Sequence, residues 1–105
     1  MILRNYSIII PKNKLYIDLQ KTLEENPHII RYVWGLHDKS ISPHYHVLLS
    51  FEDSIDQIFL AKQFAVSVGN IWELRTSWET ALAYLSDQEP DAVLHSFYKS
   101  FPLTT

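Results

Sequence analysis

The chain has 105 residues, of which 47% are hydrophobic, 13% aromatic and 20% charged. This profile indicates a single globular domain over residues 1–105, and the scarcity of Gly (2) and Pro (5) excludes collagen-like or long disordered segments. The absence of Cys excludes a disulfide scaffold, a thiol nucleophile and a thiolate metal site. The net charge of -3 argues against a protein that coats nucleic acid by bulk electrostatics, but it leaves room for a partner held through a few local contacts.

Targeting signals are also missing from the sequence. No apolar run approaches the ~20 residues of a membrane span. The first residues, Met1 to Arg4, lack the basic-then-apolar form of a signal peptide. We therefore expect a cytoplasmic protein without a membrane partner.

The first half of the chain contains a predicted helix between predicted strands. Leucines at positions 15, 19 and 23 follow helical spacing, so Lys14–Glu25 is predicted as a helix that ends at Asn26 and Pro27. The flanking segments are rich in β-branched and aromatic residues, which is typical of strands. The predicted strands are Asn5–Ile10, Ile29–Leu36 and His44–Phe51, with a polar connection at His37–Ser42.

The second half contains two capping boxes, which predict two helix starts. Ser54 with Gln57 and Thr76 with Glu79 have the required spacing. The first helix is expected to end near positions 69 and 70, where Gly and Asn suit a left-handed cap. A short strand, Ile71–Arg75, should separate the two helices. Pro at position 90 should end the second helix, and the tail from position 91 to 99 could be helical or extended.

The resulting order of elements is β-α-β-β-α-β-α. The first six elements match a split β-α-β arrangement, so the predicted fold class is α+β with a ferredoxin-like antiparallel sheet and an added C-terminal helix. The first two helices would cover one face of this sheet and leave the other face partly open.

His44 and His46 are the first candidates for chemistry. Side chains alternate along a strand, so these two imidazoles would share one face about 7 Å apart, and Tyr45 would take the other face. Such a pair can hold a divalent ion. His37, at the end of the preceding strand, could join them if the two strands form a hairpin. The alternatives are structural histidines for the pair and a loop histidine for His37.

Tyr84 is the second candidate. On the last predicted helix it lies about 110° from the centre of the apolar stripe, so its phenol flanks the core. A phenol is a usable nucleophile when a metal polarises a phosphate, although a packing role is the simpler alternative. Gln88 shares its face of the helix and could add a ligand oxygen. The stripe itself consists of Trp78, Ala81, Leu82 and Leu85.

Acidic groups offer weaker candidates. Glu52 and Asp53 could serve as ligands or as a base, although a solvated strand end is the simpler interpretation. Asp87, Glu89 and Asp91 are most simply a solvated acidic face.

Three segments, in order and at compatible spacing, resemble HUH endonucleases, in particular the rolling-circle replication initiators (Rep proteins) of small plasmids and viruses. The likeness extends over nearly the whole chain. The three segments are Trp34–Ser40 with its Leu-His-Asp sequence, Pro43–Phe51 with its His-x-His strand, and Ala83–Asp87 with its tyrosine.

The resemblance implies a metal-dependent endonuclease that nicks and rejoins single-stranded origin DNA. His44 and His46 would be the metal pair and His37 a third ligand, with Mn²⁺ or Mg²⁺ as the ion. Tyr84 would form a 5′-phosphotyrosine link and free a 3′-OH that primes rolling-circle replication. Tyr98 and Tyr45 are fallback nucleophiles.

The chain departs from the family pattern at several places. An acidic ligand of some plasmid relatives falls at Ser40, and the His of the third motif is replaced by Asp87. A Lys that many viral relatives carry three residues after the Tyr is absent as well. Asp38 and Gln88 are the substitute ligands. A Gln four residues after the Tyr is also similar to single-tyrosine HUH transposases, where that Gln helps to bind metal.

The expected partners follow from the same resemblance. They are single-stranded or origin DNA, a host helicase and polymerase, and a second copy in a homo-oligomer. The alternatives to an initiator are a transposase and a non-catalytic domain that binds single-stranded nucleic acid. The expected DNA-contacting residues are Arg4, Lys12, Lys39 and Arg75.

Overall fold

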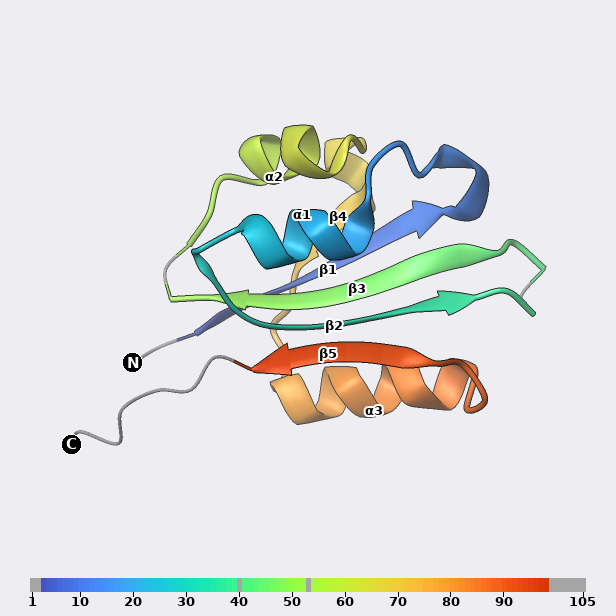
Figure 1. Ribbon diagram of the computed structural model, residues 1–105. Helices are drawn as coiled ribbons and strands as arrows, with labels where there is room; N and C mark the ends of the chain where they lie inside the picture. Colours follow the sequence, from blue (N-terminus) through green and yellow to red (C-terminus); the bar gives the residue numbers. More distant parts are fainter. Residues whose placement is uncertain (1–2, 40, 53, 99–105) are drawn as a thin grey trace.

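The computed structural model describes residues 3–39, 41–52 and 54–98, so Ser40 and Asp53 lie outside the described residues. The fold is α+β, as predicted, with one five-stranded antiparallel sheet and three α-helices (Figure 1). Two short 3-10 turns span Lys12–Lys14 and Val68–Asn70. The helices are α1 (Leu19–Glu25), α2 (Gln57–Phe64) and α3 (Trp78–Gln88). The strands are β1 (Arg4–Pro11), β2 (Ile29–His37), β3 (His44–Phe51), β4 (Ile71–Glu73) and β5 (Leu94–Tyr98).

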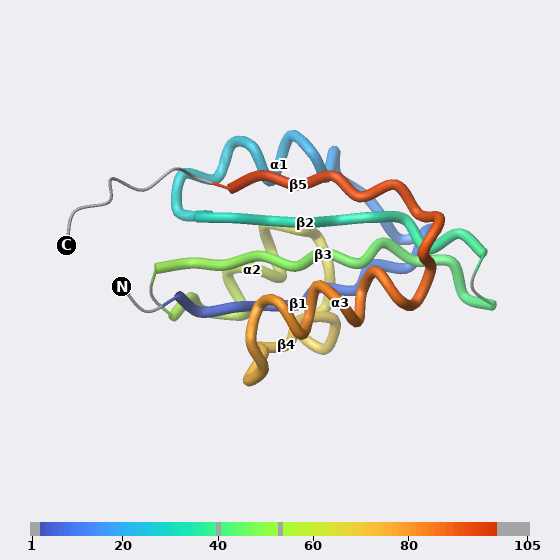
Figure 2. Tube along the Cα trace, turned by 90° about the horizontal axis from the view of Figure 1, so that it is seen from below, coloured from blue at the N-terminus to red at the C-terminus, as the bar shows by residue number. Residues whose placement is uncertain are grey.

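The strands lie side by side in the order β4-β1-β3-β2-β5, and every neighbouring pair is antiparallel (Figure 2). The hairpin of β2 and β3 places His37 directly opposite His44 and places residue 35 opposite His46. On the other side of β3, His46 lies opposite Ile9 of β1. Since paired residues share a face of a sheet, this register determines which side chains meet.

One face of the sheet packs against α1 and α2, above the sheet in Figure 1. The alternate residues of β3 from Val47 to Phe51 point into this core, and Tyr45 packs against its edge. Alternation therefore places His44, His46 and Leu48 on the other face. The core also contains Tyr6, Ile8, Ile10, Leu19, Leu23, Leu60 and Phe64.

The other face packs against α3, which lies below the sheet in Figure 1. Trp78, Ala81 and Leu85 of α3 are buried against Val33 of β2 and Leu48 of β3. Three of the four predicted stripe residues are thus buried, and the fourth packs against this cluster while partly exposed. One helix covers only part of the sheet face on which the two histidines of β3 lie.

The first helix is shorter than the leucine spacing predicts. It begins after Asp18, whose carboxylate accepts a hydrogen bond from the backbone N–H of Lys21. Leu15 and Ile17 still pack against the core, but from a segment outside the helix. An N-cap aspartate therefore sets the start of the helix, because its carboxylate satisfies a backbone donor of the first turn that has no partner within the helix.

The caps of the other two helices also differ from the predictions. Asp56 caps α2 in place of Ser54, and Ser77 caps α3 one residue after the predicted box begins. The hydroxyl of Tyr6 accepts a hydrogen bond from the backbone N–H of Ile55, which ties down the segment before α2. At its end, α2 stops at Ala65 in the left-handed conformation (φ 54°), earlier than the predicted Gly-Asn site.

The described part of the tail is extended. Residues 94–98 form β5, which pairs with β2 and adds a fifth strand at that edge of the sheet. No helix in the described ranges is long and apolar enough to cross a bilayer.

The tight approach of β5 to β2 makes Gly35 hard to replace. A Cβ at Gly35 would lie 2.8 Å from Cδ2 of Leu94 and 3.2 Å from the carbonyl oxygen of Val93. Gly35→Ala should therefore lower the free energy of unfolding by about 1–3 kcal/mol, measured by urea denaturation. The control is Gly69→Ala, whose Cβ would meet only the Ser67 hydroxyl at 3.7 Å and should change stability by less than about 0.5 kcal/mol. Equal stability of the two variants would contradict the tight contact.

Candidate metal centre and adjoining cavity

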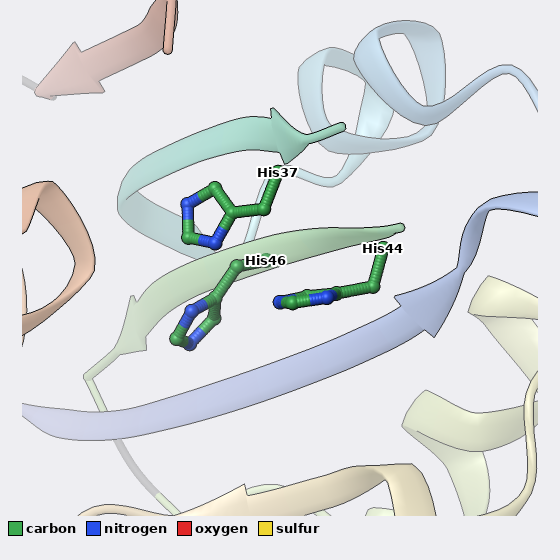
Figure 3. A group of neighbouring side chains, drawn as sticks. All are labelled: His37, His44 and His46. Carbon is green, nitrogen blue, oxygen red and sulfur yellow. The ribbon is translucent and has the colours of Figure 1, made fainter. Parts of the chain in front are cut away.

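Three histidines meet at the end of the hairpin formed by β2 and β3 (Figure 3). His37 ends β2, and His44 and His46 are alternate residues at the start of β3. One nitrogen from each ring can be chosen so that all three atoms lie within 4.8 Å of one another. The predicted pair thus shares a face, and the hairpin brings His37 to it.

The three rings cluster without stacking. The ring centroid of His37 lies 5.1 Å from that of His44 and 5.8 Å from that of His46, and the interplanar angles are 70° and 78°. The centroids of His44 and His46 are 6.4 Å apart. Because the rings do not lie flat on one another, one nitrogen of each can come within 4.8 Å of the other two.

Hydrogen bonds fix the orientation of two of the rings. Nε2 of His46 lies 2.8 Å from the Oγ of Ser7 on β1, and Nδ1 of His44 lies 2.9 Å from the backbone carbonyl oxygen of Ser42. Since a carbonyl only accepts, Nδ1 of His44 carries the proton and Nε2 is left with its lone pair. A Ser7 hydroxyl that accepts from Nε2 of His46 leaves Nδ1 of that ring as the lone-pair atom in the same way.

Two of the ring nitrogens are buried without a hydrogen-bond partner in the described structure. They are Nε2 of His37 and Nδ1 of His46. Both residues are almost fully buried, with 2% and 4% of their surfaces exposed. Buried polar atoms are normally paired, so two unpaired nitrogens that belong to one cluster call for a shared partner.

The surroundings of His37 and His46 disfavour the charged form of both imidazoles. Burial, followed by the nearby His37, lowers the pKa of His46 to about 4. Burial, followed by the charge of His44, lowers the pKa of His37. The Gln88 amide opposes both shifts, and neutral imidazoles are the form that binds metal.

The depressed pKa of His46 predicts acid sensitivity in metal-free protein. The unfolded chain binds a proton near pH 6.5 and the folded chain only near pH 4, so this contribution is present above pH 6.5 and is lost as the pH falls toward 4. The loss should approach about 3 kcal/mol, and His37 contributes with the same sign.

Urea denaturation in EDTA at several pH values between 4 and 7 measures this loss. His46→Gln removes the titrating group and should flatten the dependence, whereas His28→Gln, which replaces an exposed imidazole, should not. The same slope in all three proteins would contradict a buried neutral His46.

The cluster fits a divalent metal ion. Three imidazoles offer nitrogens within 4.8 Å of one another, two ring nitrogens have no hydrogen-bond partner, and two of the rings are oriented by hydrogen bonds at their other nitrogen. Metal-bound imidazoles usually have such a bond at the second nitrogen. The three-histidine group could therefore hold an ion. Imidazole ligands favour a transition-metal ion over Mg²⁺, which prefers oxygen.

Tyr84 and His46 line the same cavity, which has a volume of about 420 Å³ and lies between α3 and the sheet. Tyr84 is 64% exposed, in agreement with its predicted position beside the apolar stripe. Gln88 lines this cavity and also a second one, together with His37 and His44. One turn of α3 thus brings the phenol and a carboxamide to the cavity that His46 lines, and the carboxamide also borders His37 and His44.

Asp38, the other proposed extra ligand, is engaged elsewhere. Its carboxylate accepts a hydrogen bond from Nζ of Lys12 at 2.9 Å, and it does not belong to the three-histidine group. This contact also raises the pKa of Lys12. The neighbouring Glu89 lines the second cavity and accepts a hydrogen bond from the backbone N–H of Lys39.

Three of the four basic residues proposed for DNA contact are paired with carboxylates. Arg4 pairs with Glu73 at 3.6 Å, and the Lys39 ammonium pairs with Asp91 at 3.6 Å. Lys39 also lines the cavity beside His37 and His44. Lys12 pairs with the carboxylate of Asp38. Arg75 is exposed two residues beyond β4.

The two fallback tyrosines lie away from the cluster. Tyr45 packs toward the core on the opposite face of the sheet, 6.1 Å from the ring of Trp34. The hydroxyl of Tyr98 accepts a hydrogen bond from Nε1 of Trp78 at the other end of α3. Tyr84 is the tyrosine that reaches the cavity of His46.

Two residues of this region were not singled out from the sequence. Ser7 orients His46, and Trp72 forms part of the cavity wall. Ser7 is the one polar residue within the apolar run from Tyr6 to Ile10, which is a signal for a buried hydrogen bond. The role of Trp72 depends on the pairing of β4 with β1, which local sequence does not encode.

Comparison with known proteins does not assign a function, so the candidate function must be argued from the site. No family model, curated protein or solved structure matches this chain.

Proposed function

We propose that this protein is an HUH-type endonuclease that nicks and rejoins single-stranded DNA at a replication origin through a phosphotyrosine intermediate. One observation carries the proposal: Tyr84 lines the same cavity as His46, a member of the three-histidine group. A nucleophile beside a group suited to a metal ion is what phosphoryl transfer to a tyrosine requires.

Tyr84 supplies the nucleophilic oxygen. Its Oη attacks the phosphorus and forms a P–O bond, while the bond from phosphorus to the 3′ oxygen breaks. The phenol proton passes to solvent, which the exposed side chain contacts, and the leaving 3′ oxygen takes a proton from solvent. Because one phosphodiester is exchanged for another, the reverse attack by a 3′-OH rejoins the strand.

The histidines would hold the ion that this chemistry needs. His37, His44 and His46 would bind Mn²⁺, which, when bound, withdraws charge from the scissile phosphate. Gln88 is placed to add an oxygen ligand or to orient the phosphate, because it lines both cavities that border the cluster. All three ligands lie on strands of one sheet, which limits the reorganisation required.

The sheet order supports a ferredoxin-like arrangement. The segment β4-β1-β3-β2 interleaves two β-α-β units, and β1 and β2 are joined through α1 with β3 between them. In this interpretation α1 and α2 cover one face, and α3 is the catalytic helix added on the other face. The fifth strand extends this arrangement at one edge.

A single-tyrosine transposase is the second candidate within the same chemistry. The observation that favours it is the position of Gln88, four residues after Tyr84 and on the wall of both cavities. Both candidates predict the same phosphotyrosine bond. DNA ends that carry hairpins would identify a transposase substrate, and an origin sequence would identify an initiator substrate.

The test is direct detection of the covalent bond. The protein is incubated with labelled single-stranded oligonucleotides that tile its own replicon, with Mn²⁺ or with EDTA, and the products are separated under denaturing conditions. We expect a labelled adduct with Mn²⁺ and none with EDTA. Mass spectrometry of the digested adduct should locate the nucleotide on the peptide that contains Tyr84.

Two results would contradict the proposal. If the protein retains oligonucleotides but forms no adduct on any of them, it is a binding module. An adduct that forms equally well in EDTA would exclude a role for the metal.

A further inference from the structure

The cavity beside His46 has one wall that the proposed chemistry does not use. This wall is formed by Trp72 together with Ile9, Leu48 and Leu74, so it is apolar. Trp72 is 48% exposed, whereas Trp78 is buried at 4%. A half-exposed indole on a three-residue edge strand contributes little to the core, because one of its surfaces faces the cavity.

The register of the sheet fixes the distance from this indole to the histidines. Trp72 on β4 lies opposite Ser7 on β1, and Ser7 binds Nε2 of His46 on β3. The indole is therefore two strand spacings, about 10 Å across the sheet, from the strand that carries the histidine pair. Neighbouring parts of one flexible ligand can thus contact Trp72 and the histidine cluster at the same time.

The surroundings of the cavity define the chemistry of its occupant. In the proposed reaction Tyr84 and His46 require a phosphodiester, and the flat indole of Trp72, which lines the same cavity, offers a stacking surface. Thr76 and Thr80 also line the cavity, and each carries a hydroxyl group. Arg75, which precedes Thr76 in the sequence, is exposed. A volume of about 420 Å³ lies within the range of pockets that hold small ligands.

We infer that Trp72 is a stacking platform for an unpaired nucleobase close to the scissile phosphate. A nucleotide of single-stranded DNA combines an aromatic face with an anionic phosphate, which matches a cavity lined both by an indole and by the proposed nucleophile. Base-paired DNA would not fit, because its bases are already stacked on one another. The stacking site rests on the proposed function, because that function supplies single-stranded DNA as the ligand. It adds to that function a residue, Trp72, that selects unpaired bases.

The experiment measures base-dependent affinity. Fluorescence anisotropy follows the binding of a labelled oligothymidylate, and of an abasic oligonucleotide of equal length, in EDTA so that no bond is cleaved. Trp72→Ala should weaken oligothymidylate binding about tenfold and leave binding of the abasic strand unchanged. Trp72→Phe should keep most of the affinity. The slope of log affinity against log salt should stay the same, because no phosphate contact is removed.

The matched control is Phe59→Ala. Phe59 lies on α2, which packs on the opposite face of the sheet, and it is 56% exposed, so its loss removes a similar exposed aromatic surface away from the cavity. It should not change either affinity.

Equal affinity of Trp72→Ala and wild type for oligothymidylate would overturn the stacking site, and so would an equal loss on the abasic strand. A change of oligomeric state in Trp72→Ala without a change in affinity would assign the surface to a second copy and would also overturn it.

The stacking site and the proposed function can fail separately. A wild-type protein that forms the adduct, with unchanged affinity in Trp72→Ala, would remove the stacking site and keep the endonuclease. A wild-type protein that forms no adduct, with base-dependent loss in Trp72→Ala, would remove the endonuclease and keep the stacking site.

Discussion

Tyr84→Phe is expected to lower the yield of covalent protein–DNA adduct by about three orders of magnitude or more, because it removes the only atom that forms the bond. The phenol is 64% exposed, so the loss of its oxygen should change the free energy of unfolding by less than about 0.5 kcal/mol. Affinity for single-stranded DNA and for Mn²⁺ should stay close to wild type. Denaturing gel electrophoresis of the adduct, with a binding assay on the same preparation, checks all three expectations.

Two other tyrosines provide the controls for this variant. Tyr98→Phe removes the acceptor for the Trp78 indole N–H and should cost about 1 kcal/mol of stability while adduct formation is retained. Tyr45→Phe changes a ring on the opposite face of the sheet and should also retain activity. If Tyr84→Phe still formed the adduct while either control lost it, the nucleophile would have been assigned to the wrong tyrosine.

The histidine cluster shows what a local pattern can predict. Alternation along a strand was enough to place His44 and His46 on one face, because side-chain direction has a period of two. His37 was a candidate only on the condition that the two strands form a hairpin, and the observed pairing places it opposite His44. These steps use only neighbouring residues in the sequence.

Other features depend on contacts that local sequence does not contain. The tail residues from Leu94 to Tyr98 became a strand because β2 offered an open edge and Gly35 left room for Leu94. The start of α2 moved to Asp56 because the Tyr6 hydroxyl, 49 positions away from Ile55, holds the preceding segment. Propensity could not choose between these alternatives, since both candidate caps are good ones.

The engagement of Asp38 follows the same rule. Sequence alone made this carboxylate a candidate ligand because it adjoins His37. The partner that occupies it, Lys12, comes from the turn after β1, and the two ends meet only in the folded sheet. Gln88, by contrast, kept its predicted relation to Tyr84, because helical spacing alone puts both side chains on one face.

His46→Ala should weaken Mn²⁺ binding at least about 100-fold, with loss of the adduct and little change in retention of single-stranded DNA. The ring supplies a buried nitrogen that has no hydrogen-bond partner, and its removal leaves only two imidazoles in the group. Ser7→Ala leaves the ring in place but removes the bond to Nε2, and should weaken metal binding about tenfold. His28→Ala removes an exposed imidazole and should have no effect. Calorimetric titration with Mn²⁺ ranks the four proteins.

The competing interpretation treats His46 as a core residue whose polarity is incidental. In that case His46→Ala would unfold the protein, and Mn²⁺ would not stabilise the wild type. A metal centre predicts the reverse, because an ion that binds only the folded state adds about 2.7 kcal/mol of stability at 100 times its dissociation constant. Wild type should therefore melt at a higher temperature with Mn²⁺, and His46→Ala should melt at the same temperature with and without it. The difference between these two responses separates a ligand from a packing residue even if the variant is less stable at the outset, since each protein is compared with itself.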